Sequence, residues 1–478
     1  MEDTLEEKER STGHQGLSRC RPATKDRNYP DDHHGNVHGF ARTASDMEQN
    51  DDLRTIDIPH SEDSESTAPW DQPIPTEGWR NPGWCVILSP FLVGFATTGN
   101  SFCWGLFQEL YATHTFTNEA SEFTISWIGS IQFCALVIPG LIITPVIRRL
   151  GFRRTIVIGA FFNCFGYVLA SLATHVWQLF LTQGIMIGLG GGMAYATAIP
   201  LPSQWFNKRR ALAVGLGSAG TGIGGLCLSP LTEYLISHFG FRIALRVLGC
   251  FSLGLLLTGG FFARSRYRPP PSAPTLPGSL GVFWDPDMQT VAFVLLMIFS
   301  LLAPIGFFSF IALAPSYAAY LDGSKEAGSL VVSLISGTNA ICRILSGFVA
   351  DRIGRVTTLA ATTFLSGLFA MTLWQFSSSI NTYIAYSVIC GLTSGVYNSL
   401  IPIATAEVAG MKNIQRGTGV CLFLTIFTNS SAPSIAKKLQ SVFGWTAAIQ
   451  FLGAGAVAAG LVAFAVRLTM PKKSLHPP

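Results

Sequence analysis

The chain has 478 residues, of which 49% are apolar and only 13% are charged. A soluble protein carries about 25% charged residues, so this composition excludes an ordinary soluble globule. The charge is also uneven, because residues 1–80 hold eighteen acids and nine bases, whereas residues 81–478 hold ten acids and twenty-three bases. An acidic segment therefore precedes a basic, apolar body.

Residues 1–80 are rich in Asp, Glu, Ser, His, Asn and Pro and lack apolar periodicity, which predicts a disordered cytoplasmic tail. His33, His34 and His38 could ligate a metal there, but no structured partner ligands accompany them. Nine of the ten cysteines lie in apolar segments, without the spacing of a metal site or a disulfide framework. We therefore expect no metal, no cofactor and no nucleic acid.

From residue 84 onward the chain contains apolar stretches of about the 20 residues that a helix needs to cross a bilayer. An open strand cannot satisfy its backbone in lipid, so each stretch is predicted to be a helix. Only Thr174 and His175 separate the third span from the fourth. The twelve predicted spans are 84–107, 123–146, 155–174, 176–200, 211–231, 244–263, 289–313, 328–350, 356–376, 380–404, 416–436 and 445–467.

The loop charges indicate the orientation of these spans. If both termini are cytoplasmic, the inner loops hold fourteen Lys and Arg residues and the outer loops hold four or five. This bias agrees with the positive-inside rule. The sequence thus predicts a multi-pass protein of the plasma membrane, with both termini in the cytoplasm and the lipid bilayer as its surroundings.

The chain also shows a weak internal repeat. RRLGFRR at 148–154 follows the second span and DRIGR at 351–355 follows the eighth, with Gly151 and Gly354 separated by 203 residues. Such a repeat is typical of duplicated half-transporters. We therefore predict an all-α membrane protein with twelve transmembrane helices in two six-helix bundles. The predicted bundles are 81–263 and 289–467, joined by a Pro-rich cytoplasmic linker, 264–288, and followed by a cytoplasmic tail, 468–478.

The glycine-centred loops resemble the signature loop of the major facilitator superfamily, most closely in the second copy, because the first has Ile147 and Arg148 and no acid. Other stretches are similar to the fungal branch of its monocarboxylate porter family: QWFNKRRALAVGLGSAGTGIGG (204–225), APSYAAYLDG (314–323) and NAICRILSGFVADRIGR (339–355). The resemblance implies the two-bundle major facilitator fold. It also places Arg343 at the family's intramembrane arginine.

Two departures from this family bear on the cargo. No Lys or Arg lies between Arg80 and Arg148, and Asn339 stands where lactate carriers of the family have an acid. The resemblance therefore implies a larger, less lactate-like cargo. We predict a secondary transporter, not an enzyme, that exports a small organic anion such as a fungal secondary metabolite. Uptake of a monocarboxylate or a riboflavin-like nutrient, and a transporter-like nutrient sensor, remain alternatives, with protons as a candidate coupling ion.

Arg343 is the central candidate for substrate binding, because a guanidinium keeps its charge and is costly inside a membrane span unless it is paired or hydrated. It could bind a carboxylate or enolate through two parallel hydrogen bonds, or instead form a structural pair with the other bundle. The other candidates could line the cavity or form hydrogen bonds between helices. They are Asn339, Asn100, Gln132 and Asn398, with Phe307, Phe308 and Tyr397 as apolar walls.

A second group of candidates lies at the predicted cytoplasmic mouth. Asp351, Arg352 and Arg355 could form a latch between the bundles, or serve only as positive-inside anchors. Arg148 and Arg149 carry the same ambiguity, and for them anchoring is favoured. Glu407 could be an ion-pair partner of this gate or a solvated acid. Close helix packing is expected at glycines of the fifth span, Gly217, Gly220 and Gly224.

Overall fold

The computed structural model describes residues 78 and 80–470, apart from 112–114, 117–118, 267–287 and 323–324. All described residues belong to one compact unit, Glu65–Pro478. The three tail histidines and nearly all of the predicted N-terminal tail, linker and C-terminal tail lie outside the described residues.

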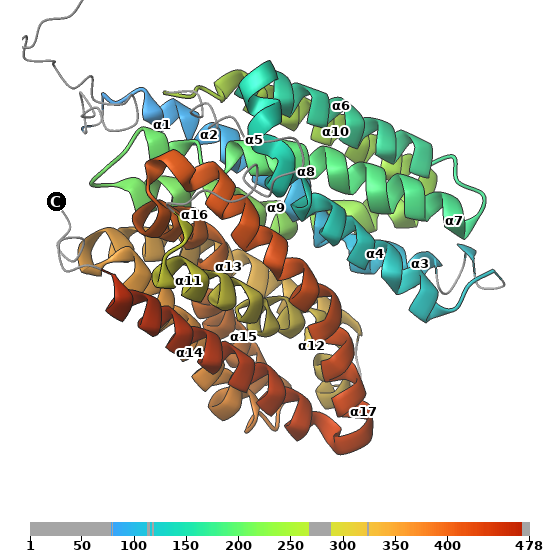
Figure 1. The fold of residues 1–478 in the computed structure, drawn as a ribbon. Helices are drawn as coiled ribbons and strands as arrows, with labels where there is room; N and C mark the ends of the chain where they lie inside the picture. Colours follow the sequence, from blue (N-terminus) through green and yellow to red (C-terminus); the bar gives the residue numbers. More distant parts are fainter. Residues whose placement is uncertain are drawn as a thin grey trace, which may run out of the picture. The chain divides into compact units, whose positions relative to one another are not determined.

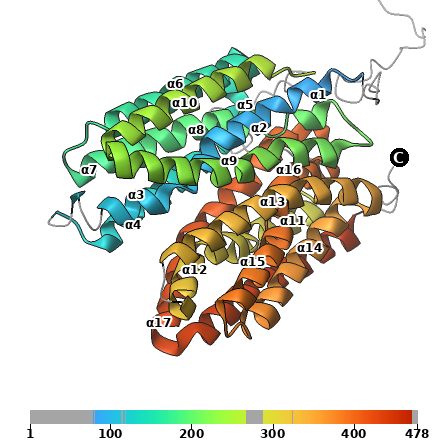
Figure 2. The ribbon, with the colours of Figure 1, turned by 180° about the vertical axis from the view of Figure 1, so that it is seen from behind.

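The described part of the chain folds into helices that follow the predicted spans, and these form two groups (Figure 1, Figure 2). The blue-to-green group contains α1 (Gly83–Val86), α2 (Leu88–Gly94), the π-helical turn η1 (Phe95–Gly99), α3 (Trp104–Leu110), α4 (Glu122–Val137), α5 (Pro139–Leu150), α6 (Phe152–Ala170), α7 (Val176–Leu179), η3 (Phe180–Met186), α8 (Ile187–Ala198), η4 (Pro202–Gln204), α9 (Arg210–Phe239) and α10 (Phe241–Phe262). Within it, α6 packs against α8 and α10, and α2 packs against α9.

The yellow-to-red group follows the linker. It contains α11 (Val291–Leu302), α12 (Pro304–Asp322), α13 (Lys325–Ile353), α14 (Arg355–Phe369), η7 (Ala370–Trp374), α15 (Ile380–Ser394), α16 (Val396–Ala409), η8 (Met411–Asn413) and α17 (Ile414–Thr469). Here α17 packs against α11, α12 and α14, while α13 packs against α12 and α15. The first and second groups are called the first and second halves below.

The predicted twelve spans are reached from the long, apolar helices of the described residues by two additions, a division of α17 and the inclusion of α6. In the described part of the chain, nine helices are long and apolar enough to cross a membrane, or ten if the bent pair of α4 and α5 is one span. The 56-residue α17 has non-helical backbone at Gly444 (φ 85°, ψ 178°), so it contains two helices. The 19-residue α6, which is not among those nine or ten helices, is counted as the twelfth.

The turns between helices explain why the repeat is centred on glycine. Gly151 ends α5 and Gly354 ends α13, with φ of 80° and 117°, in a region that side chains with a Cβ disfavour. The structure also separates the third span from the fourth. α6 ends at Ala170, and the side chain of Gln178 accepts a hydrogen bond from the Thr174 amide (2.7 Å) at the start of α7.

Large apolar side chains cover the outside of both halves. Phe165, Phe261, Phe376 and Phe443 are 57%, 65%, 79% and 70% exposed, respectively. A protein surrounded by water does not sustain this much exposed apolar surface, whereas lipid tails cover it at no cost. The exposed surface therefore agrees with a membrane-spanning chain.

Candidate functional site

A small cavity lies between the two halves. Its walls come from α4 and α8 of the first half and from α12, α16 and α17 of the second, with one residue from η1; the lining residues are Thr98, Phe133, Leu136, Val137, Tyr195, Ala196, Phe308, Tyr397, Asn398, Leu422 and Thr425. The rings of Phe133 and Phe308 meet edge to face, with centroids 4.7 Å apart. The free space of about 20 Å³ holds roughly one water. An organic cargo needs hundreds of Å³, so the halves must part to admit it.

Arg343 lies behind the wall of this cavity. Its side chain is 1% exposed, and its Nε donates to Oδ1 of Asn339 at 2.8 Å. Its Nη1 is buried without a hydrogen-bond partner among the described residues. The phenols of Tyr195 and Tyr397, both wall residues, lie close enough to interact electrostatically with the guanidinium. A positive charge therefore stands between two phenols at a site shared by both halves.

Two hydroxyls of the cavity wall have only poorly aligned partners among the described residues. Thr98 Oγ1 adjoins Tyr195, and Tyr397 Oη adjoins Asn398, but neither hydroxyl makes a hydrogen bond of normal geometry to a described residue. A buried polar atom without a partner costs about 1–3 kcal/mol, and such atoms in native proteins usually meet water or a ligand. Nη1 of Arg343, together with these two poorly paired wall hydroxyls, thus indicates a place for a polar ligand.

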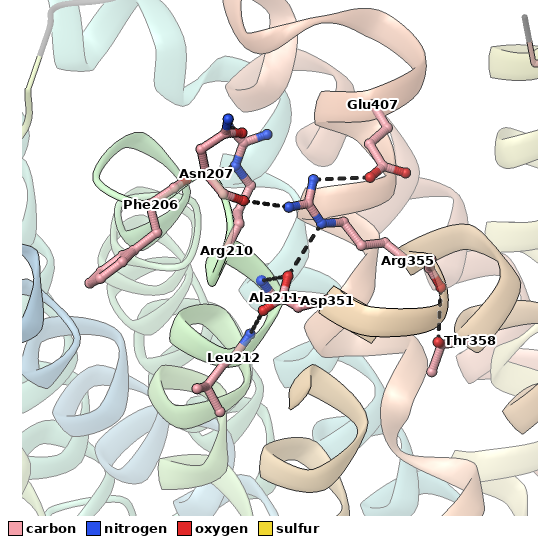
Figure 3. A network of polar contacts seen from close by, with 10 residues as sticks. Phe206, Asn207, Arg210, Ala211, Leu212, Asp351, Arg355, Thr358 and Glu407 are labelled. Atoms are coloured by element: carbon pink, nitrogen blue, oxygen red, sulfur yellow. Dashed lines mark hydrogen bonds and ion pairs between the residues drawn. The ribbon is translucent and has the colours of Figure 1, made fainter. Parts of the chain in front are cut away.

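A polar network closes the two halves at one end, where α13 meets the start of α9 (Figure 3). Asp351 accepts the backbone N–H of Ala211 through Oδ1 and that of Leu212 through Oδ2, both at 2.9 Å. These amides belong to the first turn of α9, where backbone N–H groups have no helical partner. A carboxylate from the second half therefore caps a helix of the first half, and the helix dipole favours its charge.

Arg355 completes this network. Its Nη2 donates to the backbone carbonyl of Asn207 in the first half (2.6 Å), and its Nη1 pairs with Oε1 of Glu407 (3.0 Å). Its Nε reaches Oδ1 of Asp351 at 3.4 Å. The side chains of Arg355, Asp351 and Glu407 are only 10–20% exposed, so water screens these charges weakly. The residues Asn207, Ala211, Leu212, Asp351, Arg355 and Glu407 are called the gate below.

The sequence matches a known family over nearly all of the described helices. The family model of the Major Facilitator Superfamily matches residues 90–322 and 296–478. The chain belongs to the Major Facilitator Superfamily. It is therefore a membrane transporter and not an enzyme, which confirms the predicted family and fold.

Individual relatives of this transporter agree with that assignment. The MFS transporter asaE of Aspergillus flavus is 29% identical, over 81% of this chain and 86% of its own. The aspyridones efflux protein apdF of Emericella nidulans is 27% identical, over 84% of this chain and 80% of its own. Human monocarboxylate transporter 12 is also 27% identical, over 81% of this chain and 79% of its own. FucP in its outward conformation shares the fold, with a TM-score of 0.63 at 12% identity, over 80% of this chain and 98% of its own.

The transporter places the remaining predicted binding residues in two surroundings. Asn398 lines the cavity, whereas Asn339 holds Arg343 and packs against Gly395, which lies between α15 and α16. Asn100 donates to Oγ of Ser252 in α10 at 3.5 Å, a contact within the first half. Gln132 is buried in α4, one residue before the wall residue Phe133. Arg343 and Asn339 thus bind one another, Asn398 lines the cavity, and Asn100 binds a neighbouring helix.

The predicted gate residues divide in the same way. Asp351 and Arg355 join the network. Glu407 pairs with Arg355, which agrees with the first of its two interpretations, an ion-pair partner of the gate. Arg352 lies over the ring of Phe348, 4.1 Å from its centroid, on its own helix. Arg149 is exposed, and Arg148 lies near Arg416 of α17.

The glycines of α9 face two different neighbours in this transporter. Gly217, Gly220 and Gly224 meet Pro90, Phe91 and Phe95 of the first span, within the first half. Gly215 and Gly222 instead face α13, and a Cβ on Gly222 would lie 2.7 Å from the carbonyl oxygen of Ser336. The close packing predicted at Gly217, Gly220 and Gly224 therefore joins helices within the first half. Gly215 and Gly222 allow α9 to pack closely against α13 of the second half.

Proposed function

We propose that this transporter carries a small organic anion by alternating access, with Arg343 as the cation that attracts it. The observation that supports this most is the buried guanidinium behind a two-half cavity, whose Nη1 has no hydrogen-bond partner in the described part of the chain. Burying such a charge costs several kcal/mol unless another group compensates it. An anionic group of the cargo supplies that compensation in the bound state.

The gate and the cavity together support the alternating cycle. The gate joins the halves at one end, and the cavity is too small for an organic cargo in this conformation. Binding and release therefore need the halves to separate, first at one end and then at the other. We propose that the gate faces the cytoplasm, because the loops at its end carry the basic residues that remain on that side.

We propose export of a secondary metabolite as the direction and cargo. The similarity to a protein named as an aspyridones efflux protein supports export. The wall residues Phe133, Phe308, Tyr195 and Tyr397 offer aromatic faces, which suit a conjugated enolate or carboxylate more than lactate. The absence of a basic residue between Arg80 and Arg148 agrees with a site that holds one buried cation.

Flux into vesicles tests this proposal. The panel contains aromatic carboxylates, tetramic-acid and polyketide enolates, flavins and neutral analogues of the same size. Arg343→Gln is expected to lower anion flux at least tenfold and to leave neutral-analogue flux unchanged, while Arg343→Lys retains part of the anion flux. Arg246→Gln is the matched control, because Arg246 donates to Ser171 Oγ (3.0 Å) and does not line the cavity. Equal anion flux in the parent and in Arg343→Gln would refute the role of Arg343.

Monocarboxylate uptake is the second candidate, favoured by the similarity to human monocarboxylate transporter 12 over 81% of this chain. Lactate and pyruvate in the same panel decide between the two cargo classes, with an imposed pH gradient to detect proton coupling. A nutrient sensor is distinguished by deleting residues 1–78. A carrier keeps its flux after the deletion, whereas a sensor loses signalling.

A further inference from the structure

The first half carries a base at the repeat position where the second half carries Asp351. Arg148 stands 203 positions before Asp351, as Gly151 stands before Gly354, so the repeat replaces the acid with a base. Arg148 lies near Arg416, in the first turn of α17. Positive charges are unfavourable at a helix N-terminus and repel one another. The contact of α17 with α5 and α8 is called the α17 interface below, and an uncharged hydrogen bond crosses it.

A proline in the first half leaves one backbone carbonyl without its helical partner. The amide of Ile199 donates to the Tyr195 carbonyl at 3.1 Å, so the helical pattern continues to that residue. The next donor along the helix would be residue 200, bonding to the carbonyl of Ala196, but Pro200 has no N–H. Gln415 of α17 supplies the missing donor, because its Nε2 donates to the Ala196 carbonyl at 2.6 Å.

The surroundings of this bond place it between the two halves and beside the cavity. The side chain of Gln415 is 7% exposed, and Ala196 is a wall residue of the cavity. Next to it, Gly140 of α5 touches Gly419 of α17, since a Cβ on Gly140 would lie 3.3 Å from the Gly419 Cα and 3.9 Å from the Ala196 Cβ. The bond therefore lies in a close-packed contact where few other polar groups can replace it.

We propose that Gln415 is an uncharged latch, a positioning residue that holds α17 against α8 while the halves are closed and releases when they part. The proposal rests on alternating access, because a latch acts only if the halves separate. The latch uses a carbonyl that Pro200 frees, so it needs no acid in the first half. Because the acceptor belongs to the cavity wall, a cargo that displaces α8 acts on the latch directly.

Hydrogen–deuterium exchange of the full-length protein in lipid nanodiscs tests this latch at segments 195–207 and 411–422. Gln415→Leu removes the donor. Pro200→Ala supplies a helical N–H that competes for the Ala196 carbonyl, so it is expected to release α17 although α8 gains a bond. Each variant should raise exchange in both segments roughly three- to tenfold, as expected for one lost buried hydrogen bond. The double variant should raise it no further, because both changes remove the same contact.

Two further variants sharpen the test. Pro230→Ala, at an exposed proline of α9, is the matched control and should leave both segments unchanged. Gln415→Glu should make the latch depend on pH, because a protonated carboxyl donates to the carbonyl and an ionised one repels it. The ratio of its exchange rate to that of the parent at the same pH should be about one in acid and should rise severalfold in alkali. A destabilised fold alone would not produce this pH profile.

Three results would overturn the proposal. The first is an unchanged exchange rate in Pro200→Ala, and the second is an acceleration in the double variant that equals the product of the two single accelerations. The third is a ratio of the exchange rates of Gln415→Glu and the parent that does not vary with pH. If Gln415→Leu does not fold, Pro200→Ala and Gln415→Glu decide the question. The readout involves no cargo, so a failed flux test of Arg343 leaves the latch intact. Normal exchange in the latch variants, together with the expected flux loss in Arg343→Gln, would refute the latch alone.

Discussion

Replacing Asp351 with asparagine is expected to weaken the closed gate by about 2 kcal/mol. The carboxylate accepts two backbone N–H groups at 2.9 Å, whereas an asparagine has one acceptor oxygen and no charge. Losing a hydrogen bond to a charged group costs about 1.5–3 kcal/mol, and the lost helix-dipole interaction costs about 0.3–1 kcal/mol. Asparagine is itself a good helix cap, which offsets part of this loss. The net change corresponds to roughly thirtyfold in the ratio of closed to open gate.

Amide exchange measures this change where it occurs. The N–H groups of Ala211 and Leu212 are the donors to Asp351, so their exchange in nanodiscs should accelerate roughly thirtyfold in Asp351→Asn. Glu119→Gln is the matched control, since Glu119 accepts the Val176 amide at 3.1 Å at the start of α7, within the first half. Exchange at Ala211 and Leu212 within twofold of the parent would refute the reasoning. So would equal acceleration at these amides in the Glu119 control.

The remaining predictions address the rest of the gate and the packing. Glu407→Gln should accelerate the same amides by less than Asp351→Asn, because Arg355 keeps its bond to the Asn207 carbonyl. Ser430→Cys should form a disulfide with Cys134 on oxidation and stop flux until a reductant is added, since Cys134 Sγ and Ser430 Oγ lie 3.2 Å apart across the halves. Gly220→Ala has no space beside the Phe91 carbonyl and should lower the unfolding temperature, with a cost of about 1–3 kcal/mol. Gly254→Ala, with open space around it, should not lower it.

The helices could be predicted because lipid imposes a simple rule on the sequence. A span needs an unbroken apolar stretch, and the charges gather at its ends, so hydropathy alone located the helices to within a few residues in most cases. The internal bends were not predictable in this way. The break between α4 and α5 before Pro139 and the π-helical turn at Thr98 depend on packing with neighbouring helices, which hydropathy does not record.

The site was predictable only where it uses charge. Arg343, Asp351 and Arg355 stand out because charged residues are rare and costly in apolar segments. Tyr195 was missed, although it is the one aromatic residue in the Gly- and Ala-rich α8. The carbonyls of Asn207 and Ala196 carry no signal at all in residue type, because every residue has one. The sequence feature that indicates the free Ala196 carbonyl is Pro200, because proline has no N–H to donate to the carbonyl four residues before it.

The two interfaces of the closed transporter use different kinds of hydrogen bond, one charged and one neutral. At the start of α9, the carboxylate of Asp351 faces a helix N-terminus, and this favours closure. At the start of α17, the base Arg148 stands at the position that corresponds to Asp351 and lies near Arg416, and the hydrogen bond from Gln415 that crosses this contact is uncharged. A neutral bond such as that of Gln415 contributes only about 1 kcal/mol. Because the halves are rigid bundles, the weaker α17 interface is expected to part first, and the gate then opens as α9 moves away from Asp351.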